Sequence, residues 1–193
     1  MLIKITNKIK IEIGAKPLLI AEISANHGGN KKKFLKHILE AHKAGADMIK
    51  IQTYEADDIT IKKYSDKVKI KKGIWKNKSP WQIYKKAQTP YSWHNDAFKL
   101  AKRINAVLFS TPFSLRSVDF LEKFKVPIYK IASLEITDLN LIKYIEQKKE
   151  SLFPSNEPNR NANATAEIRK YNNLESLSTA TTDTTATTAT TAA

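Results

Sequence analysis

Apolar residues recur along the first 150 positions with two periods, one typical of strands and one typical of helices. Apolar residues at three- and four-residue spacing predict helices that begin after the N-cap residues Asn30, Thr89, Ser114 and Asp138. Alternating or continuous apolar runs predict parallel strands at residues 18–24, 47–52, 106–111 and 127–132. This repeated alternation of strand and helix predicts right-handed βα units around a parallel sheet.

The N-terminal segment follows a different pattern. Isoleucines lie at positions 3, 5, 9, 11 and 13, on either side of Asn7 and Lys8, which predicts a β-hairpin within residues 1–16. The predicted fold class is therefore α/β. We expect the N-terminal half of a TIM (β/α)8 barrel in residues 1–149, with about four βα units preceded by this hairpin.

Residues 150–193 differ in composition from residues 1–149. The stretch 151–160 is rich in Pro, Asn and Ser, and the chain ends in Thr and Ala repeated with a three-residue period. So few bulky apolar side chains cannot offset the entropy cost of ordering the backbone. We therefore expect a low-complexity tail that is disordered or out of frame with the preceding barrel.

A carboxylate and an ammonium group lie at the carboxyl ends of two neighbouring predicted strands. Because side chains alternate along a strand, Glu22 in the first, and Lys50 and Gln52 in the second, point away from the face that packs on helices. Barrels and open α/β sheets place their chemistry at these strand ends. A plain buried ion pair is the alternative, but inward charges are costly unless they have a function, so we favour an active site.

The histidines and tryptophans give weaker evidence of a functional role. His27 lies in a loop, where an ordinary surface residue is the alternative to a functional one. His37, His42 and His94 lie on predicted helices, where structural roles are more common than catalytic ones. Three further residues are expected to be packing anchors: Trp75, Trp81 and Trp93.

Composition narrows the function classes. The 33 Lys and Arg residues exceed the 19 Asp and Glu residues and give a formal net charge of +14. The lysines are scattered over predicted helix surfaces, which favours a solvated surface over a nucleic-acid footprint. The absence of cysteine excludes disulfides and thiolate metal sites. No apolar run approaches the roughly 20 residues of a membrane span and no signal peptide is recognisable, which predicts a cytoplasmic protein without a membrane partner.

Several motifs together resemble one enzyme family. They are residues 20–27 (IAEISANH), 50–54 (KIQTY), 110–113 (STPF) and 129–133 (YKIAS). In these motifs the chain resembles the sialic acid synthase family over residues 17–149. Residues 73–75 (GIW) and 89–94 (TPYSWH) are similar to the pseudaminic acid synthase branch of that family.

The resemblance implies a transferase that forms a C–C bond. In the family, phosphoenolpyruvate condenses with an N-acylated amino sugar to give a nonulosonic acid, either pseudaminic or sialic acid. By the same resemblance Glu22 is the catalytic residue that handles a proton. The residues implied to bind phosphoenolpyruvate are Lys50, Thr111, Lys130 and Ser133, and those implied to line the sugar site are Gln52, Phe113 and Glu135.

The resemblance also implies a divalent metal, Mn²⁺ or Mg²⁺, and a homodimer. In the family two histidines on later barrel strands hold the metal, and a C-terminal antifreeze-like domain completes the neighbouring subunit's site. Neither feature is recognisable after residue 149, so we expect a truncated or frameshifted chain that lacks the metal ligands and is inactive alone. A basic, non-catalytic binding module for anionic sugar or nucleic acid is the second hypothesis, and the salt dependence of binding distinguishes the two.

Overall fold

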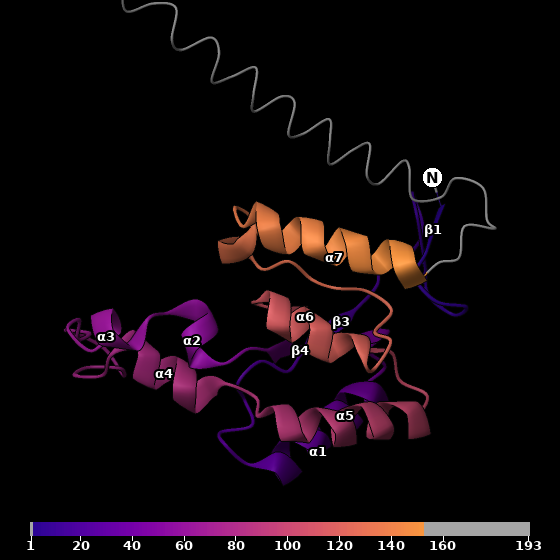
Figure 1. Cartoon of the computed structure of the whole chain (residues 1–193). Helices are drawn as coiled ribbons and strands as arrows, with labels where there is room; N and C mark the ends of the chain where they lie inside the picture. The colour runs from indigo at the N-terminus through magenta and orange to yellow at the C-terminus, as the bar shows by residue number, and fades with distance from the viewer. Residues whose placement is uncertain (1, 153–193) are drawn as a thin grey trace, which may run out of the picture. The chain divides into compact units, whose positions relative to one another are not determined.

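Three parallel strands form the centre of the fold (Figure 1). The computed structural model describes residues 2–152. Within them β3 (Ile20–Glu22), β4 (Met48–Thr53) and β5 (Leu108–Pro112) pair in that order. Both pairings are parallel, as predicted, so the three carboxyl ends meet at one edge of the sheet.

The helices α1 (Lys31–Lys43) and α5 (Tyr91–Arg103) pack against one face of this sheet. The first of them begins where the side chain of Asn30 accepts a hydrogen bond from the backbone N–H of Lys33 (3.0 Å), as the sequence predicted. It ends before Gly45, whose φ of 86° lies in the left-handed region that glycine adopts readily. Side chains from both helices and from the outward strand positions form the buried layer between them: Phe34, Ile38, Ile49, Ile51, Ala97 and Leu100.

The predicted N-terminal hairpin is present. Its strands β1 (Leu2–Lys4) and β2 (Lys10–Glu12) pair antiparallel. Ile9 packs with Met48 at the start of β4 and with Phe109 near the start of β5. The hairpin therefore covers the amino ends of the strands, opposite to the edge where the candidate polar residues lie.

A long connection with three short helices joins β4 to α5. These are α2 (Ala56–Ile59), α3 (Lys62–Ser65) and α4 (Pro80–Ala87). A capping box starts the third of them, because Ser79 Oγ accepts from the backbone N–H of Gln82 and the Gln82 side chain accepts from the backbone N–H of Ser79.

The prediction of a fourth strand is wrong. The segments α6 (Leu115–Glu122), η1 (Ser133–Glu135) and α7 (Leu139–Leu152) follow β5, but residues 127–132 form no strand. Tyr129 makes a single parallel bridge to Ser110, and the backbone N–H of Lys130 donates to the Ser110 carbonyl (3.3 Å). Pro127 has no N–H to donate, and among residues 2–152 no further strand lies beyond this segment to complete a ladder.

The described residues up to Glu146 form one compact unit, and its partial βα barrel confirms the predicted fold class. No helix in the described part of the chain is both long and apolar enough to cross a bilayer. The last helix continues through the domain boundary predicted at residue 149 and ends at Leu152. The predicted tail of residues 150–193 lies, from residue 153 onward, outside the described residues, so that assignment stays a prediction.

Candidate active site

Glu22 and Lys50 are neighbours across two parallel strands. They are paired residues in the register of β3 and β4, and Nζ of Lys50 forms an ion pair with Oε2 of Glu22. The other carboxylate oxygen, Oε1, accepts a hydrogen bond from the backbone N–H of Ser24 (2.9 Å). Ser24 has a φ of 47°, so the chain turns sharply directly after the strand. The turn and the ion pair together fix the Glu22 carboxylate at the carboxyl edge of the sheet.

Thr111 lies on the other side of Lys50, at the end of β5. Its Oγ1 is 3.4 Å from Nζ of Lys50, a long hydrogen bond in which the ammonium donates. Thr111 is buried, and the side chain of Lys50 is only 13% exposed. Three adjacent strands therefore bring a carboxylate, an ammonium and a hydroxyl together.

Lys130 adds a second positive charge near this cluster. Burial, and then the charge of Lys130, lower the pKa of Lys50 to about 8, while the ion pair with Glu22 favours the charged form. Two ammonium groups held close to one partly buried point repel each other, and a bound anion would relieve the repulsion. The electrostatics favour a ligand that carries more than one negative charge.

Glu135 lies at the end of η1, beyond the segment that carries Lys130. Its Oε2 is buried and has no hydrogen-bond partner within the described residues. Burial raises the pKa of Glu135 and Lys130 opposes the rise, so the two side chains lie close enough to interact. A buried acceptor without a donor is costly, and a polyhydroxylated ligand could supply the donor. Ser133 starts the same short helix and is exposed, and no hydrogen bond within residues 2–152 joins it to Lys50, so its role stays a prediction.

Aromatic side chains border the carboxyl edge. Phe113 packs edge-to-face against Tyr54, with ring centroids 5.1 Å apart, and Tyr54 packs in the same way against Tyr84 of α4 at 6.3 Å. Burial raises the pKa of Tyr54 to about 12, so its hydroxyl stays protonated. Gln52 is half-buried two residues before Tyr54. No role was predicted for Tyr54 or Tyr84, although Tyr54 ends the motif 50–54 (KIQTY) and directly follows the polar end of a strand.

A buried hydrogen-bond network lies behind the site, on the helix-facing side of the strands. Nε2 of His94, on α5, is 2.9 Å from Oγ1 of Thr53, which lies 2.6 Å from Oγ of Ser110. Burial lowers the pKa of His94 to about 4, so the ring is neutral at pH 7. Its Nδ1–H then donates to the carbonyl of Pro90 (3.2 Å), and Nε2 accepts from Thr53. The network joins the ends of β4 and β5, and it confirms that His94 is structural.

His27 is buried, and its interpretation as a surface residue is wrong. Its Nδ1 accepts a hydrogen bond from the backbone N–H of Gly29 (3.0 Å), and its ring packs edge-to-face on Phe34 and Trp93. Nε2 lies 3.3 Å from Oγ1 of Thr89. Thr89 was expected to cap the following helix, but that hydroxyl faces His27 and the N-cap residue is Pro90. Trp93 is a packing anchor, as predicted.

The described residues supply no cluster of metal ligands. No group of three or more His, Asp or Glu side chains in residues 2–152 is placed to hold a metal ion. Glu22 is engaged by Lys50, and both ring nitrogens of His27 and of His94 form hydrogen bonds within the fold. The described residues alone do not fit the divalent metal that the resemblance implies, and we assign no chemical step to it.

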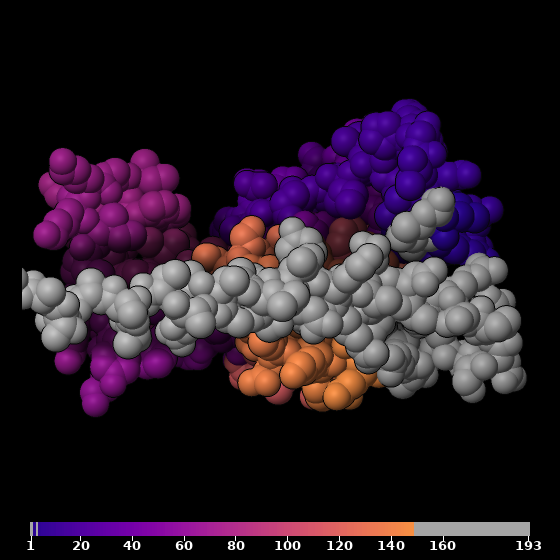
Figure 2. Space-filling model, turned by 90° about the horizontal axis from the view of Figure 1, so that it is seen from above, coloured from indigo at the N-terminus to yellow at the C-terminus, as the bar shows by residue number. Residues whose placement is uncertain are grey.

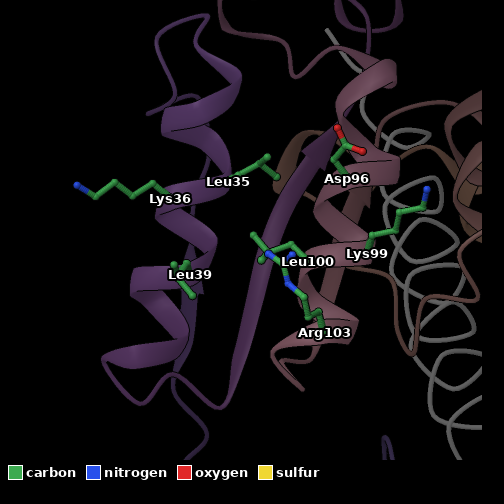
Figure 3. A pocket seen from close by; sticks show the side chains of 7 residues that line it. All are labelled: Leu35, Lys36, Leu39, Asp96, Lys99, Leu100 and Arg103. Atoms are coloured by element: carbon green, nitrogen blue, oxygen red, sulfur yellow. The ribbon is translucent and has the colours of Figure 1, made fainter.

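A groove of about 540 Å³ lies elsewhere, between α1 and α5. Figure 3 shows Leu35 and Leu100 between the two helices, with Lys36 and Lys99 pointing away on either side, and Leu39 also lines the groove. The groove shares no residue with the cluster around Lys50 and lies on the helix-covered side of the sheet, so we do not place the substrate there.

Comparisons with known proteins agree with the motifs. The model of the NeuB family matches residues 37–182. Pseudaminic acid synthase of Campylobacter jejuni is 42% identical over 140 residues, which cover 72% of this chain and 41% of that protein. Pseudaminic acid synthase of Helicobacter pylori is 37% identical over 126 residues, which cover 65% of this chain and 37% of that protein. The chain therefore spans about two fifths of the length of these relatives.

A solved structure shares the fold of this region. N-acetylneuraminic acid synthetase from Leptospira borgpetersenii, determined in complex with citrate, matches with a TM-score of 0.64 at 26% sequence identity. The match covers 77% of this chain and 47% of that one. The partial βα barrel described here is thus similar to part of the relative's fold.

Proposed function

The chain belongs to the NeuB family, and on that premise we propose that its described residues form the phosphoenolpyruvate-binding part of a nonulosonic acid synthase active site. Two relatives carry the name pseudaminic acid synthase, which favours that branch over the sialic acid branch. The complete reaction joins the methylene carbon of phosphoenolpyruvate to the aldehyde carbon of an N-acylated amino sugar, adds water, and releases phosphate.

One observation supports the anion-binding role most strongly. The Lys50 ammonium is held between Glu22 and Thr111 in a largely buried position, and Lys130 lies near enough to lower its pKa. Phosphoenolpyruvate carries a carboxylate and a phosphate, which match two converging ammonium groups. In this proposal the hydroxyls of Thr111 and Ser133 donate additional hydrogen bonds to the same ligand.

Glu22 is the proposed proton acceptor. Its carboxylate is ion-paired with Lys50, which favours the ionised form that a base requires. When phosphoenolpyruvate binds to the ammonium groups of Lys50 and Lys130, the ion pair between Lys50 and the Glu22 carboxylate is weakened. It would then take a proton from the attacking water or from a sugar hydroxyl.

The sugar is proposed to bind next to Phe113, Gln52 and Glu135. The unsatisfied Oε2 of Glu135 would accept a hydrogen bond from a sugar hydroxyl. Phe113, backed by Tyr54, offers an apolar face to the sugar ring or its acyl group.

Calorimetric titration of the purified chain with phosphoenolpyruvate tests this function. We expect saturation at one ligand per chain and competition by citrate. Binding should depend only weakly on salt, because Lys50 is largely shielded from solvent. Binding that does not saturate and collapses in moderate salt would favour the alternative of a diffuse basic surface.

The chain by itself is expected to bind phosphoenolpyruvate without turning it over. The matched residues cover only 41% and 37% of the two relatives, and no described cluster supplies ligands for a metal that would polarise the sugar aldehyde. Phosphate release from phosphoenolpyruvate that requires both the amino sugar and Mn²⁺ would show this expectation to be wrong.

A further inference from the structure

Residues 61–78, between α2 and α4, form a basic surface segment that we call the basic loop. It contains eight lysines and one acidic residue, Asp66, and residues 67–78 contain no acidic residue at all. Figure 1 shows α3, which is the first part of the basic loop, grouped with α2 and α4 beyond the end of α5. Figure 2 shows the magenta part of the chain, which includes this segment, on the surface of the molecule.

The tip of the basic loop is held by backbone hydrogen bonds. The N–H of Ile70 donates to the carbonyl of Lys78 (3.0 Å), and the N–H of Asn77 donates to the carbonyl of Ile70 (2.9 Å). Between these anchors the side chain of Ile74 is 86% exposed and that of Trp75 is 41% exposed. Trp75 was expected to be a packing anchor, and this exposure corrects that expectation.

Bulky apolar side chains therefore project from a surface dense in positive charge. The exposed apolar residues of the basic loop are Ile61, Tyr64, Val68, Ile74 and Trp75. By contrast, Trp81, which follows the loop, donates its Nε1–H to Asp57 (2.8 Å) and lies under the ammonium groups of Lys62 and Lys85. Trp81 is thus a packing anchor, whereas Trp75 lies at the tip without such a contact among the described interactions.

The combination of an exposed Ile–Trp pair and flanking lysines fits an anionic bilayer surface. Tryptophan favours the headgroup level, isoleucine favours the acyl boundary, and lysines are attracted to anionic lipid phosphates. A second copy of this chain is a poor binding partner for the basic loop, because each copy carries a formal net charge of +14 and the two would repel each other. A single-stranded nucleic acid would use the lysines and stack on Trp75, but it gives no role to the exposed Ile74.

We propose that the basic loop docks this chain reversibly on an anionic lipid surface, with Ile74 and Trp75 entering the headgroup region. Lys71, Lys72 and Lys76 flank the pair and meet the lipid phosphates. The sequence predicted no membrane partner because no segment is long enough to span a bilayer. Peripheral docking by the tip of a folded loop requires no such segment, so this inference revises that expectation.

Vesicle co-sedimentation of the full chain tests the proposal. The chain should pellet with vesicles of phosphatidylcholine and phosphatidylglycerol, and not with vesicles of phosphatidylcholine alone. The double change Ile74→Ser and Trp75→Ser should weaken binding by about tenfold or more. The double change Lys71→Gln and Lys72→Gln should weaken it by about 25-fold, at about fivefold for each lysine.

Two matched controls should leave vesicle binding unchanged. Ile13→Ser removes an apolar side chain that is 81% exposed on the N-terminal segment. The double change Lys32→Gln and Lys36→Gln removes the same charge from exposed positions of α1. Circular dichroism melts identify any variant that fails to fold. If the Ile74 and Trp75 variant does not fold, the Lys71 and Lys72 variant tests the proposal instead.

Three results would overturn the proposal. One is an absence of binding to anionic vesicles, and another is an equal loss from the α1 control pair. The third is oligonucleotide binding that depends on Lys71 and Lys72 while the Ile74 and Trp75 variant pellets with vesicles like the parent, which would assign the loop to nucleic acid.

Discussion

Glu22 and Lys50 form an ion pair across adjacent parallel strands, at the edge of the sheet opposite to the N-terminal hairpin. The Lys50 side chain is largely buried, whereas the Glu22 side chain is 35% exposed. The ammonium is therefore the fixed member of the pair, and the carboxylate occupies the side from which an anion would approach.

Changing Glu22→Gln should strengthen the binding of inorganic phosphate. The change removes the negative charge that competes with the ligand for Lys50, and we expect the dissociation constant to fall by about threefold to tenfold. Calorimetry of both proteins measures this effect. Glu40→Gln removes an exposed carboxylate paired with Lys43 and is the control, which should change nothing. Weaker phosphate binding in the Glu22 variant would contradict the competition between carboxylate and ligand.

Phosphoenolpyruvate binding should weaken as the pH rises. Burial and Lys130 lower the pKa of Lys50 to about 8, so the ammonium is charged below that pH and loses its proton above it. Titrations between about pH 7 and about pH 9.5 should show the loss of affinity, while Lys50→Arg, which stays protonated, should give a flat profile. A flat profile in the parent protein would mean that Lys50 does not bind the ligand.

His94 should make the folded state sensitive to acid. Its pKa falls to about 4 in the fold from an ordinary value of 6.5, so the unfolded chain binds the proton more tightly. The associated stability is fully present above pH 6.5 and is lost as the pH falls towards 4, by about 3 kcal/mol in total. Urea unfolding across this range should show a shallower pH dependence for His94→Gln than for the parent. His42→Gln is the control, and equal slopes in all three proteins would contradict this assignment.

The alternation of side chains along strands was enough to predict that Glu22 and Lys50 are neighbours at one edge of the sheet. Glu22 and Lys50 lie on consecutive strands, and parallel pairing leaves the carboxyl ends of these strands side by side. The capping residue Asn30 fixed the start of the first helix for a similar local reason. Predictions of this kind succeed because each depends on a few neighbouring residues.

The errors concern features that depend on distant parts of the chain. The apolar run at 127–132 predicts extended backbone, but a strand needs a hydrogen-bonding neighbour on at least one side along its length, and Tyr129 finds one bridge. The burial of His27 depends on the rings of Phe34 and Trp93, which its own loop sequence does not reveal. The packing of Tyr54 between Phe113 and Tyr84 depends in the same way on three separate elements.

Lys50 is proposed to be part of a built anion site, and it differs in this respect from the many exposed lysines of the chain. Titration of phosphoenolpyruvate into the parent, Lys50→Ala and Lys32→Ala proteins at one ionic strength tests it most directly. Lys32 is exposed on α1, so its removal should change affinity only through screened long-range charge. We expect Lys50→Ala to abolish binding and Lys32→Ala to bind almost like the parent. Equal losses from the two changes would show that diffuse charge holds the anion and that the proposed site is wrong.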